Sequence, residues 1–181
     1  MQTYLAILRG INVSGHKPVK MVDLRNVFAE LGFENVKTYI QSGNVVFESK
    51  ETDAIKFKSS IEKAIVQRYG FEVPVLILKK AELVAIASGN PYLTDGRNED
   101  TKFLHVTFLG DEPEKIELDK LADLNYPPDE FYRIGKAMYL FTPGGYGNTK
   151  LSNTFFEAKL KVQATTRNWK TAHELLKMME G

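Results

Sequence analysis

The order of apolar segments along the chain is repeated, and this repetition constrains the fold more than any other feature of the sequence. The first half opens with a strand-like run, Thr3 to Arg9, followed by apolar residues at helical spacing up to Gly32. Two strand-like runs joined at Ser42-Gly43, a second helical stretch ending at Gly70 and a short β-branched run at 73–78 follow. The first half therefore reads β-α-β-β-α-β, which is the order of the ferredoxin-like plait.

A segment dense in turn residues, 88–100, separates this pattern from a second one and reads as a linker or crossover. After it come a strand-like run at 102–109, a helical one at 113–124, a hairpin within 131–142 and a helix at 151–160. A shift of about 93 residues superimposes the two hairpins in pattern but not in identity. The sequence therefore contains a weak internal repeat.

The end of the second half departs from the pattern. In place of a final strand, residues 165–168 lead into a helical stretch that carries Trp169, Ala172, Leu176 and Met179. We therefore predict an α+β protein of two ferredoxin-like (βαββαβ) plait halves, the second modified with an extra C-terminal helix. The predicted domains are residues 1–90, the first half, and residues 91–181, the second half with that helix.

Composition excludes several classes of protein. The chain of 181 residues is 43% hydrophobic and 26% charged, which is typical of a globular protein and excludes bulk disorder. It contains no cysteine, which excludes disulfide scaffolds, thiol catalysis and thiolate metal sites. The apolar run Tyr4 to Leu8 is too short for a signal-peptide core or a membrane span. We therefore expect a cytoplasmic protein without a membrane partner.

Charge is unevenly distributed although the net charge is only +1. Residues 111–130 hold eight acidic side chains and two lysines, whereas residues 131–181 hold eight basic and three acidic ones. One interpretation is that both segments are solvated faces of helices, where such charges are usually found. The other is that the acidic and the basic segment face different partners.

Two loops that join a strand to a helix contain glycine and lysine. The first runs from Gly10 to Pro18 and comes near a phosphate-binding P-loop, but His16 and Pro18 break the Gly-Lys-Ser/Thr succession that a P-loop requires. The second, Pro143 to Lys150, fails the same spacing. Ordinary flexible turns account for both loops. The alternative is that their backbone amides hold an anion at a helix N-terminus together with Lys17, Lys20 and Lys150.

The segment Thr165-Thr166-Arg167-Asn168-Trp169-Lys170 is predicted to open the last helix. The structural interpretation is that a threonine or asparagine side chain caps the helix while Trp169 packs inward. The functional interpretation is that free amides of the first turn, two hydroxyls and Arg167 form an anion site. Arg167 and Lys170 are unfavourable at the positive end of a helix dipole, and a bound anion would remove that conflict.

The three histidines, His16, His105 and His173, lack the spacing of metal ligands, and we expect neither a metal nor a cofactor. His105 lies in a predicted strand, where a structural role is usual, and His173 is expected to be exposed on a helix. His16 lies in a glycine-flanked loop near Lys20, which makes it the histidine best placed to act as an acid or base.

Four motifs stand out in combination: RGINV from Arg9, YIQSGNVVF from Tyr39, Asn90-Pro91 and TTRNW from Thr165. Together they resemble a bacterial family known only as a domain of unknown function, and the likeness extends over essentially the whole chain. The family pattern prefers glycine where Ser14 stands. The resemblance implies a cytoplasmic α+β protein but no activity, substrate or cofactor. It also implies that one set of residues acts together: Arg9, Gly10, Asn12, Ser42, Gly43, Asn44, Thr166, Arg167 and Asn168.

Three functions remain open, because a fold alone does not decide function. The first is a binding module for a phosphate-bearing or other anionic ligand, a nucleotide or nucleic acid, held by the family-motif residues with Lys20 and Lys150. The second is an enzyme acting on a phosphorylated or nucleotide substrate, with His16 or Lys20 as proton carrier. The third is a protein-interaction adaptor that uses the acidic segment 111–130. The first predicts that Arg9, Asn12, Asn44 and Arg167 lie around a common cleft.

Overall fold

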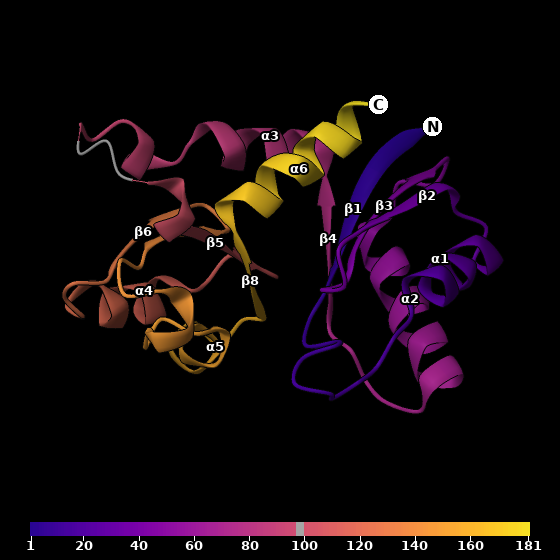
Figure 1. Ribbon diagram of the computed structural model, residues 1–181, viewed down its shortest axis with the longest axis horizontal. Helices are drawn as coiled ribbons and strands as arrows, with labels where there is room; N and C mark the ends of the chain where they lie inside the picture. The colour runs from indigo at the N-terminus through magenta and orange to yellow at the C-terminus, as the bar shows by residue number, and fades with distance from the viewer. Residues whose placement is uncertain (97–99) are drawn as a thin grey trace. The chain divides into compact units, whose positions relative to one another are not determined.

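The computed structural model describes residues 1–96 and 100–181, and Figure 1 shows how their helices and strands are connected. The elements follow one another in the order β1 (Gln2–Leu8), α1 (Met21–Glu30), β2 (Glu34–Tyr39), β3 (Asn44–Ser49), α2 (Ala54–Tyr69), β4 (Val75–Lys79), α3 (Lys80–Ser88), β5 (Leu104–Leu109), α4 (Lys115–Ala122), β6 (Glu130–Ile134), β7 (Ala137–Phe141), α5 (Asn153–Leu160), β8 (Ala164–Asn168) and α6 (Trp169–Glu180). Short 3-10 helices lie at Pro91–Leu93, Thr101–Phe103 and Tyr146–Asn148. Within the described ranges, no helix is both long enough and apolar enough to cross a membrane.

The strands form two four-stranded antiparallel sheets, with the strand orders β2-β3-β1-β4 and β6-β7-β5-β8. The same backbone hydrogen bond extends the central strand of each sheet: Leu8 N donates to Gly43 O at 2.8 Å, and Leu109 N donates to Lys136 O at 2.9 Å. Gly43 and Lys136 therefore occupy equivalent places, as the shift between the two predicted hairpins requires. The protein is thus an α+β fold with two halves of the same strand order.

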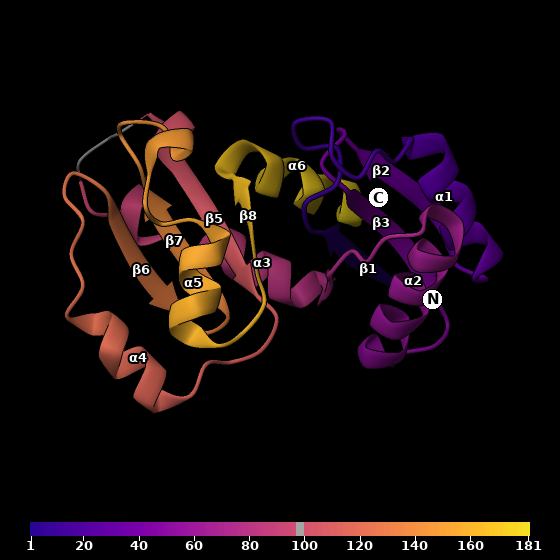
Figure 2. The same ribbon diagram turned by 90° about the horizontal axis from the view of Figure 1, so that it is seen from below.

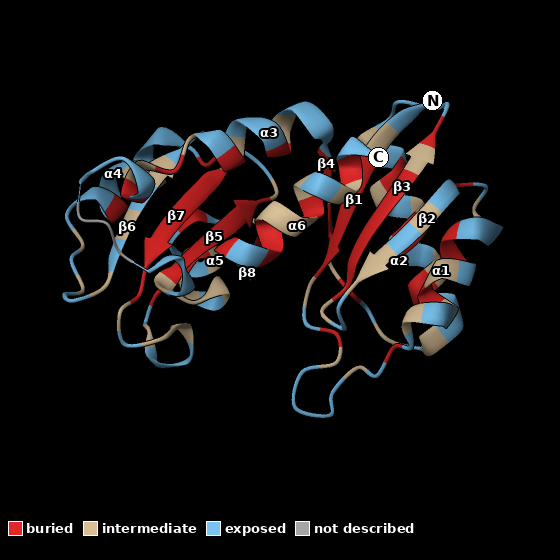
Figure 3. Cartoon of the chain, turned by 45° about the horizontal axis from the view of Figure 1, so that its top comes forward, coloured by how far each residue is buried: buried red, intermediate tan, exposed pale blue. Residues whose placement is uncertain are grey.

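Helices α1 and α2 cover one face of the first sheet, as Figure 1 shows. Phe57, Ile61 and Ile65 lie four residues apart on α2 and are all buried, so one stripe of the helix faces the sheet. The sheet contributes Tyr4 and Phe47, whose ring centroids lie 5.6 Å apart. Figure 3 shows the central strands buried along most of their length and the edge strand β2 largely exposed.

Helices α4 and α5 cover one face of the second sheet in the same way, as Figure 2 shows. Phe156 and Leu160 of α5 and Leu121 of α4 pack on Met138 and Leu140 of β7. This core is smaller than that of the first sheet because α4 and α5 have only 8 residues each, against 10 and 16 for α1 and α2.

The chain divides into two compact units. The first comprises Met1–Val84 together with Leu175–Gly181, and the second comprises Ala85–Glu174. The predicted domains, 1–90 and 91–181, stay predictions. The last turns of α6 are grouped with the first unit, although the sequence pattern assigns the whole helix to the second half.

The second half has a final strand, contrary to the prediction that residues 165–168 open a helix. They belong to β8, which pairs with β5 in the register Thr107↔Thr166. The strand was missed because it is short and polar and follows no simple alternation of burial, even though two adjacent β-branched threonines favour extended backbone. Helix α6 begins immediately after it, at Trp169.

The signals for helix ends were largely correct. Gly70 ends α2 in the left-handed conformation with φ +77°, as predicted. The cap at the other end of α2 is Asp53, because Asp53 Oδ1 accepts from the amides of Ile55 and Lys56 at 3.0 and 3.1 Å.

Residues 90–93 of the predicted linker, 88–100, form a cap of the same kind. Asn90 is only 2% exposed, and its Oδ1 accepts from Tyr92 N at 3.0 Å, which starts the 3-10 helix at Pro91–Leu93. This bond accounts for the Asn90-Pro91 motif as a helix start. Residues 97–99 of the linker lie outside the described residues.

Substitution of Gly43 by alanine is expected to destabilise the first unit. Gly43 has φ +81°, and an added Cβ would lie 2.7 Å from Leu8 Cβ and 2.9 Å from Ile11 Cδ1. We expect a loss of about 2 kcal/mol or more in the free energy of unfolding, measured with urea, because both backbone strain and overpacking contribute.

The matched control is Gly70→Ala. Gly70 has φ +77° but no atom within 4 Å of an added Cβ, so this variant should lose only the backbone component, about 1 kcal/mol. Equal losses in the two variants would show that the contact with Leu8 and Ile11 contributes nothing.

Candidate functional site

In the first unit, the side chain of Asn12 ties the loop after β1 to the turn between β2 and β3. Asn12 Nδ2 donates to Val19 O at 2.9 Å and to Gln41 O at 2.8 Å, and Asn12 Oδ1 accepts from Val19 N at 2.8 Å. Both amide hydrogens and the carbonyl oxygen are therefore used by the backbone. This arrangement gives the asparagine of the RGINV motif a structural role.

The turn itself is a four-residue connection, 40–43, rather than the tight two-residue turn that Ser42-Gly43 suggested, because Tyr39 pairs directly with Asn44. Asn44 is fully buried, and its Nδ2 donates to Tyr39 O at 3.1 Å and to Ser42 Oγ at 2.9 Å. Gly43 allows close approach of the backbone to Leu8. The SGN part of the second motif thus closes the turn.

Several residues of these two segments adopt the left-handed conformation: Asn12, Ser14, Lys17 and Ile40 have φ between +47° and +54°. For the β-branched Ile40 this conformation is a steric outlier that costs on the order of 1–3 kcal/mol and persists only where surrounding contacts impose it. Asn12 supplies such a contact, because its Nδ2 donates to the carbonyl of Gln41, the residue that follows Ile40. The two segments are therefore held in one shape.

The charged residues predicted in this region lie around that structure. Lys20 is exposed at the N-terminus of α1, which has no side-chain cap. His16 is exposed between Gly15 and Lys17, and Lys17 Nζ donates to Glu72 O at 2.6 Å. Arg9 is half-buried at the end of β1, where its amide donates to Pro74 O at 2.9 Å.

In the second unit, three side chains link β8 to β5 and α5. Thr166 Oγ1 donates to Asn153 Oδ1 at 2.7 Å and lies 2.6 Å from Thr107 Oγ1. A hydroxyl has one hydrogen, so Thr107 must donate to Thr166. The neighbouring Asn168 caps α6, because its Oδ1 accepts from Thr171 N at 2.7 Å. The prediction that an asparagine or threonine caps the last helix is thereby confirmed for Asn168.

Arg167 lies between these two polar residues, and its surroundings affect its charge. Its side chain keeps some exposed surface, but burial of the guanidinium lowers its pKa from 12.5 to about 10, while Tyr146 acts in the opposite direction. The group is still protonated at pH 7. Arg167 Nη1 donates to Thr166 O at 2.9 Å. A positive charge is thus maintained where it is poorly hydrated.

The glycine-rich segment between β7 and α5 reaches the same part of the unit. Its Tyr146 stacks on His105, with ring centroids 4.9 Å apart, and His105 Nδ1 lies 3.4 Å from Thr142 Oγ1. Burial lowers the pKa of His105, so this imidazole is neutral at pH 7. Arg167, Tyr146 and His105 form what we call the Arg167 cluster.

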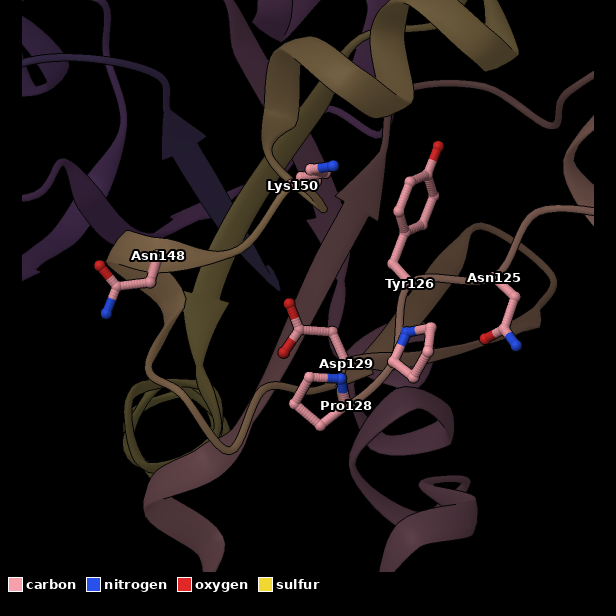
Figure 4. A pocket seen from close by; sticks show the side chains of 7 residues that line it. Asn125, Tyr126, Pro128, Asp129, Asn148 and Lys150 are labelled. Atoms are coloured by element: carbon pink, nitrogen blue, oxygen red, sulfur yellow. The ribbon is translucent and has the colours of Figure 1, made fainter.

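The same segment also lines a hollow of about 390 Å³ in the second unit. Figure 4 shows Asp129 and Pro128 beside each other, with Tyr126 and Lys150 beyond them. Lys150 Nζ lies 5.9 Å from the centre of the Tyr126 ring. Lys150, which the sequence grouped with Arg167, therefore lines this hollow, and Arg167 does not line it.

The predicted site residues thus fall into two groups. Asn12, Ser42, Gly43 and Asn44 come together in the first unit with Arg9, Gly10 and Lys20 nearby in the chain, whereas Thr166, Arg167, Asn168 and Lys150 lie in the second. Their convergence on one cleft stays a prediction.

Sequence reasoning did not consider Tyr146, although an aromatic residue inside a glycine-rich loop was a visible signal. His105 is buried in β5 beside Thr142, which agrees with the structural role expected for it. His173 is half-buried against Trp169 rather than exposed, with ring centroids 4.9 Å apart. In residues 1–96 and 100–181, no group of three or more acidic or histidine side chains is placed to hold a metal ion.

Comparison with known proteins relates the chain to a family and a fold. Residues 1–139 match the model of a family described as protein of unknown function (DUF1697). A search of curated proteins finds no match. A solved structure, that of the conserved bacterial protein SP0830 from Streptococcus pneumoniae, is similar over 98% of this chain and 98% of its own, with a TM-score of 0.77 and 24% sequence identity. At this identity the likeness shows a shared fold.

Asn12→Ala is expected to destabilise the first unit, because it removes three hydrogen bonds to backbone groups. We expect the free energy of unfolding in urea to fall by about 2–3 kcal/mol, at about 1 kcal/mol per bond. His16→Ala, in the exposed part of the same loop, is the control and should change it by less than about 0.5 kcal/mol. An Asn12→Ala variant as stable as the parent would show that Asn12 does not hold the loop.

Stability should fall as the pH is lowered below about 6.5, partly because of His105. The folded-state pKa of this histidine is depressed, so the unfolded chain binds the proton first, and acid favours unfolding. His105→Gln should make the free energy of unfolding less dependent on pH below about 6.5 than it is in the parent. Identical pH profiles from urea unfolding would contradict this.

Proposed function

The chain belongs to the DUF1697 family of proteins of unknown function, and we propose that it is a binding module for a phosphate-bearing or other anionic ligand, a nucleotide or nucleic acid, held at the Arg167 cluster. One observation carries this proposal: the guanidinium of Arg167 is kept charged where burial lowers its pKa to about 10. An anion placed beside a poorly hydrated cation replaces the lost hydration and raises that pKa again.

The chemistry around Arg167 suits a phosphate group. A guanidinium offers several donors in a planar fork that matches phosphate oxygens, and each charge-assisted hydrogen bond contributes about 1.5–3 kcal/mol. The hydroxyl of Tyr146 and the neutral ring of His105 are uncharged and do not repel an anion. The glycine-rich segment that carries Tyr146 can bring backbone amides close to a ligand.

Two finer inferences about the fold accompany this proposal. We infer that each half is a ferredoxin-like plait, which the element order and the strand orders β2-β3-β1-β4 and β6-β7-β5-β8 support. We also infer that the halves arose by duplication, which the equivalent bonds from Leu8 to Gly43 and from Leu109 to Lys136 support. A cytoplasmic location is proposed from the composition alone.

The proposal is tested by titrating the protein with inorganic phosphate, ATP and a single-stranded oligonucleotide by calorimetry. Arg167→Ala should weaken binding of the tightest of these probes by about tenfold or more, because at least one charge-assisted hydrogen bond is lost. Arg167→Lys should recover only part of the affinity, since an ammonium cannot form the bidentate fork. Binding should also weaken as salt rises, most steeply for the oligonucleotide.

Lys170→Ala is the matched control. It removes the same charge three residues away, from an exposed position outside the Arg167 cluster, and should reduce affinity by less than about threefold. The proposal fails if Arg167→Ala binds the probe as tightly as the parent, or if the two variants lose the same affinity. In the second case general electrostatic attraction, rather than a site at Arg167, would account for binding.

A further inference from the structure

The hollow lined by Lys150 and Asp129 contains two opposite charges that do not neutralise each other. Both side chains line it, and within the part of the chain that the structure describes no ion pair joins them. Two opposite charges that form an ion pair neutralise each other. Two opposite charges that line one cavity without pairing are complementary to a ligand that carries both a positive and a negative charge. The hollow therefore differs from the Arg167 cluster in having two described side chains of opposite charge in its lining.

Each of the two charges is held by a neighbouring side chain. Asp129 Oδ2 accepts from Thr149 Oγ1 at 2.6 Å, which orients the carboxylate and leaves its second oxygen for another donor. Lys150 Nζ lies over the Tyr126 ring, which itself packs edge-on against Phe155 with ring centroids 5.4 Å apart. Positions set before a ligand binds reduce the entropy lost on binding.

The remaining lining contains both polar and apolar groups. Asn125 and Asn148 contribute amide groups, and Asn148 Nδ2 donates one hydrogen to Gly144 O at 2.8 Å, which leaves its second hydrogen and its oxygen for a ligand. The Tyr126 ring and the two prolines at 127–128 supply apolar surface. The volume of about 390 Å³ lies within the range of small-molecule sites.

We propose that this hollow binds a small zwitterion, a free α-amino acid, with its carboxylate on Lys150 and its ammonium group on Asp129. A phosphate dianion is attracted by Lys150 but repelled by Asp129, whereas an α-amino acid pairs with both and brings no net charge. The amide groups and the apolar surface then contact the side chain of the amino acid.

The test uses calorimetry with four probes: glycine, L-leucine, L-phenylalanine and L-glutamine. At least one should bind, and blocking either charge of that probe, by N-acetylation or by conversion to the amide, should weaken binding by about tenfold or more. This comparison uses the unaltered protein, so it does not depend on how any variant folds.

Two variants assign the binding to the hollow. Lys150→Met and Asp129→Asn should each weaken binding of the same amino acid by about tenfold or more, and the amide oxygen introduced by Asp129→Asn would still accept from Thr149. The controls Lys159→Ala and Asp119→Asn remove the same charges from exposed positions on α5 and α4 and should leave it unchanged. Arg167→Ala should also leave it unchanged, which separates this site from the proposed anion site.

The proposal is overturned if none of the four amino acids binds at millimolar concentrations. It is equally overturned if the N-acetylated or the amidated form binds as tightly as the free amino acid, because one of the two charges would then be irrelevant. Displacement of the bound amino acid by equimolar inorganic phosphate would show that the hollow is an anion site, and would also contradict the proposal.

Discussion

A strand that is buried on both faces and has a neighbour on each side can satisfy its backbone polar groups only within its sheet, and both halves of this protein are built on such a strand. β1 lies between β3 and β4, and β5 lies between β7 and β8. At the last residue of each of these strands, the amides of Leu8 and Leu109 donate to the carbonyls of Gly43 and Lys136, just before β3 and β7. The backbone of the loops that follow is therefore held in place at their first residues, and this sets where their polar side chains lie.

The two halves differ in which connection between a strand and a helix carries the polar side chains described above. In the first half it is the connection between β1 and α1, where the side-chain amide of Asn12 forms all its hydrogen bonds with backbone groups. In the second half it is the connection between β7 and α5, which places Tyr146 near Arg167 and Lys150 in a hollow. Polar side chains hold a loop in shape in one case and face solvent-accessible space in the other. The same strand order thus supports a rigid loop in one unit and two candidate binding places in the other.

This difference bears on how the motifs of the chain are interpreted. Asn12, Gly43 and Asn44 belong to the motifs, and the fold explains each of them. Asn12 joins two segments by hydrogen bonds, a side chain at Gly43 would clash with Leu8, and the buried Asn44 closes the turn. Within TTRNW, Thr166 and Asn168 likewise link β8 to α5 and cap α6. Arg167 is the member of that motif whose pKa is lowered by burial. A position that is electrostatically unfavourable for the fold is a better indication of a ligand than one that the fold requires.

The sequence by itself determined most of the element order before β8, the α+β class, the glycine that ends α2 and the place of both hairpins, because these depend on the local periodicity of apolar residues and on glycine stereochemistry. It did not determine β8, which is short and polar and exists because Thr166 and its neighbours pair with β5, about 60 residues earlier in the chain. Nor did it indicate that Tyr146 stacks on His105, or that Asp129 and Lys150 line one hollow without forming an ion pair. Such arrangements depend on which loops the sheets bring together, and hydration and charge at a side chain are properties of those three-dimensional surroundings. Only the tertiary structure decided them.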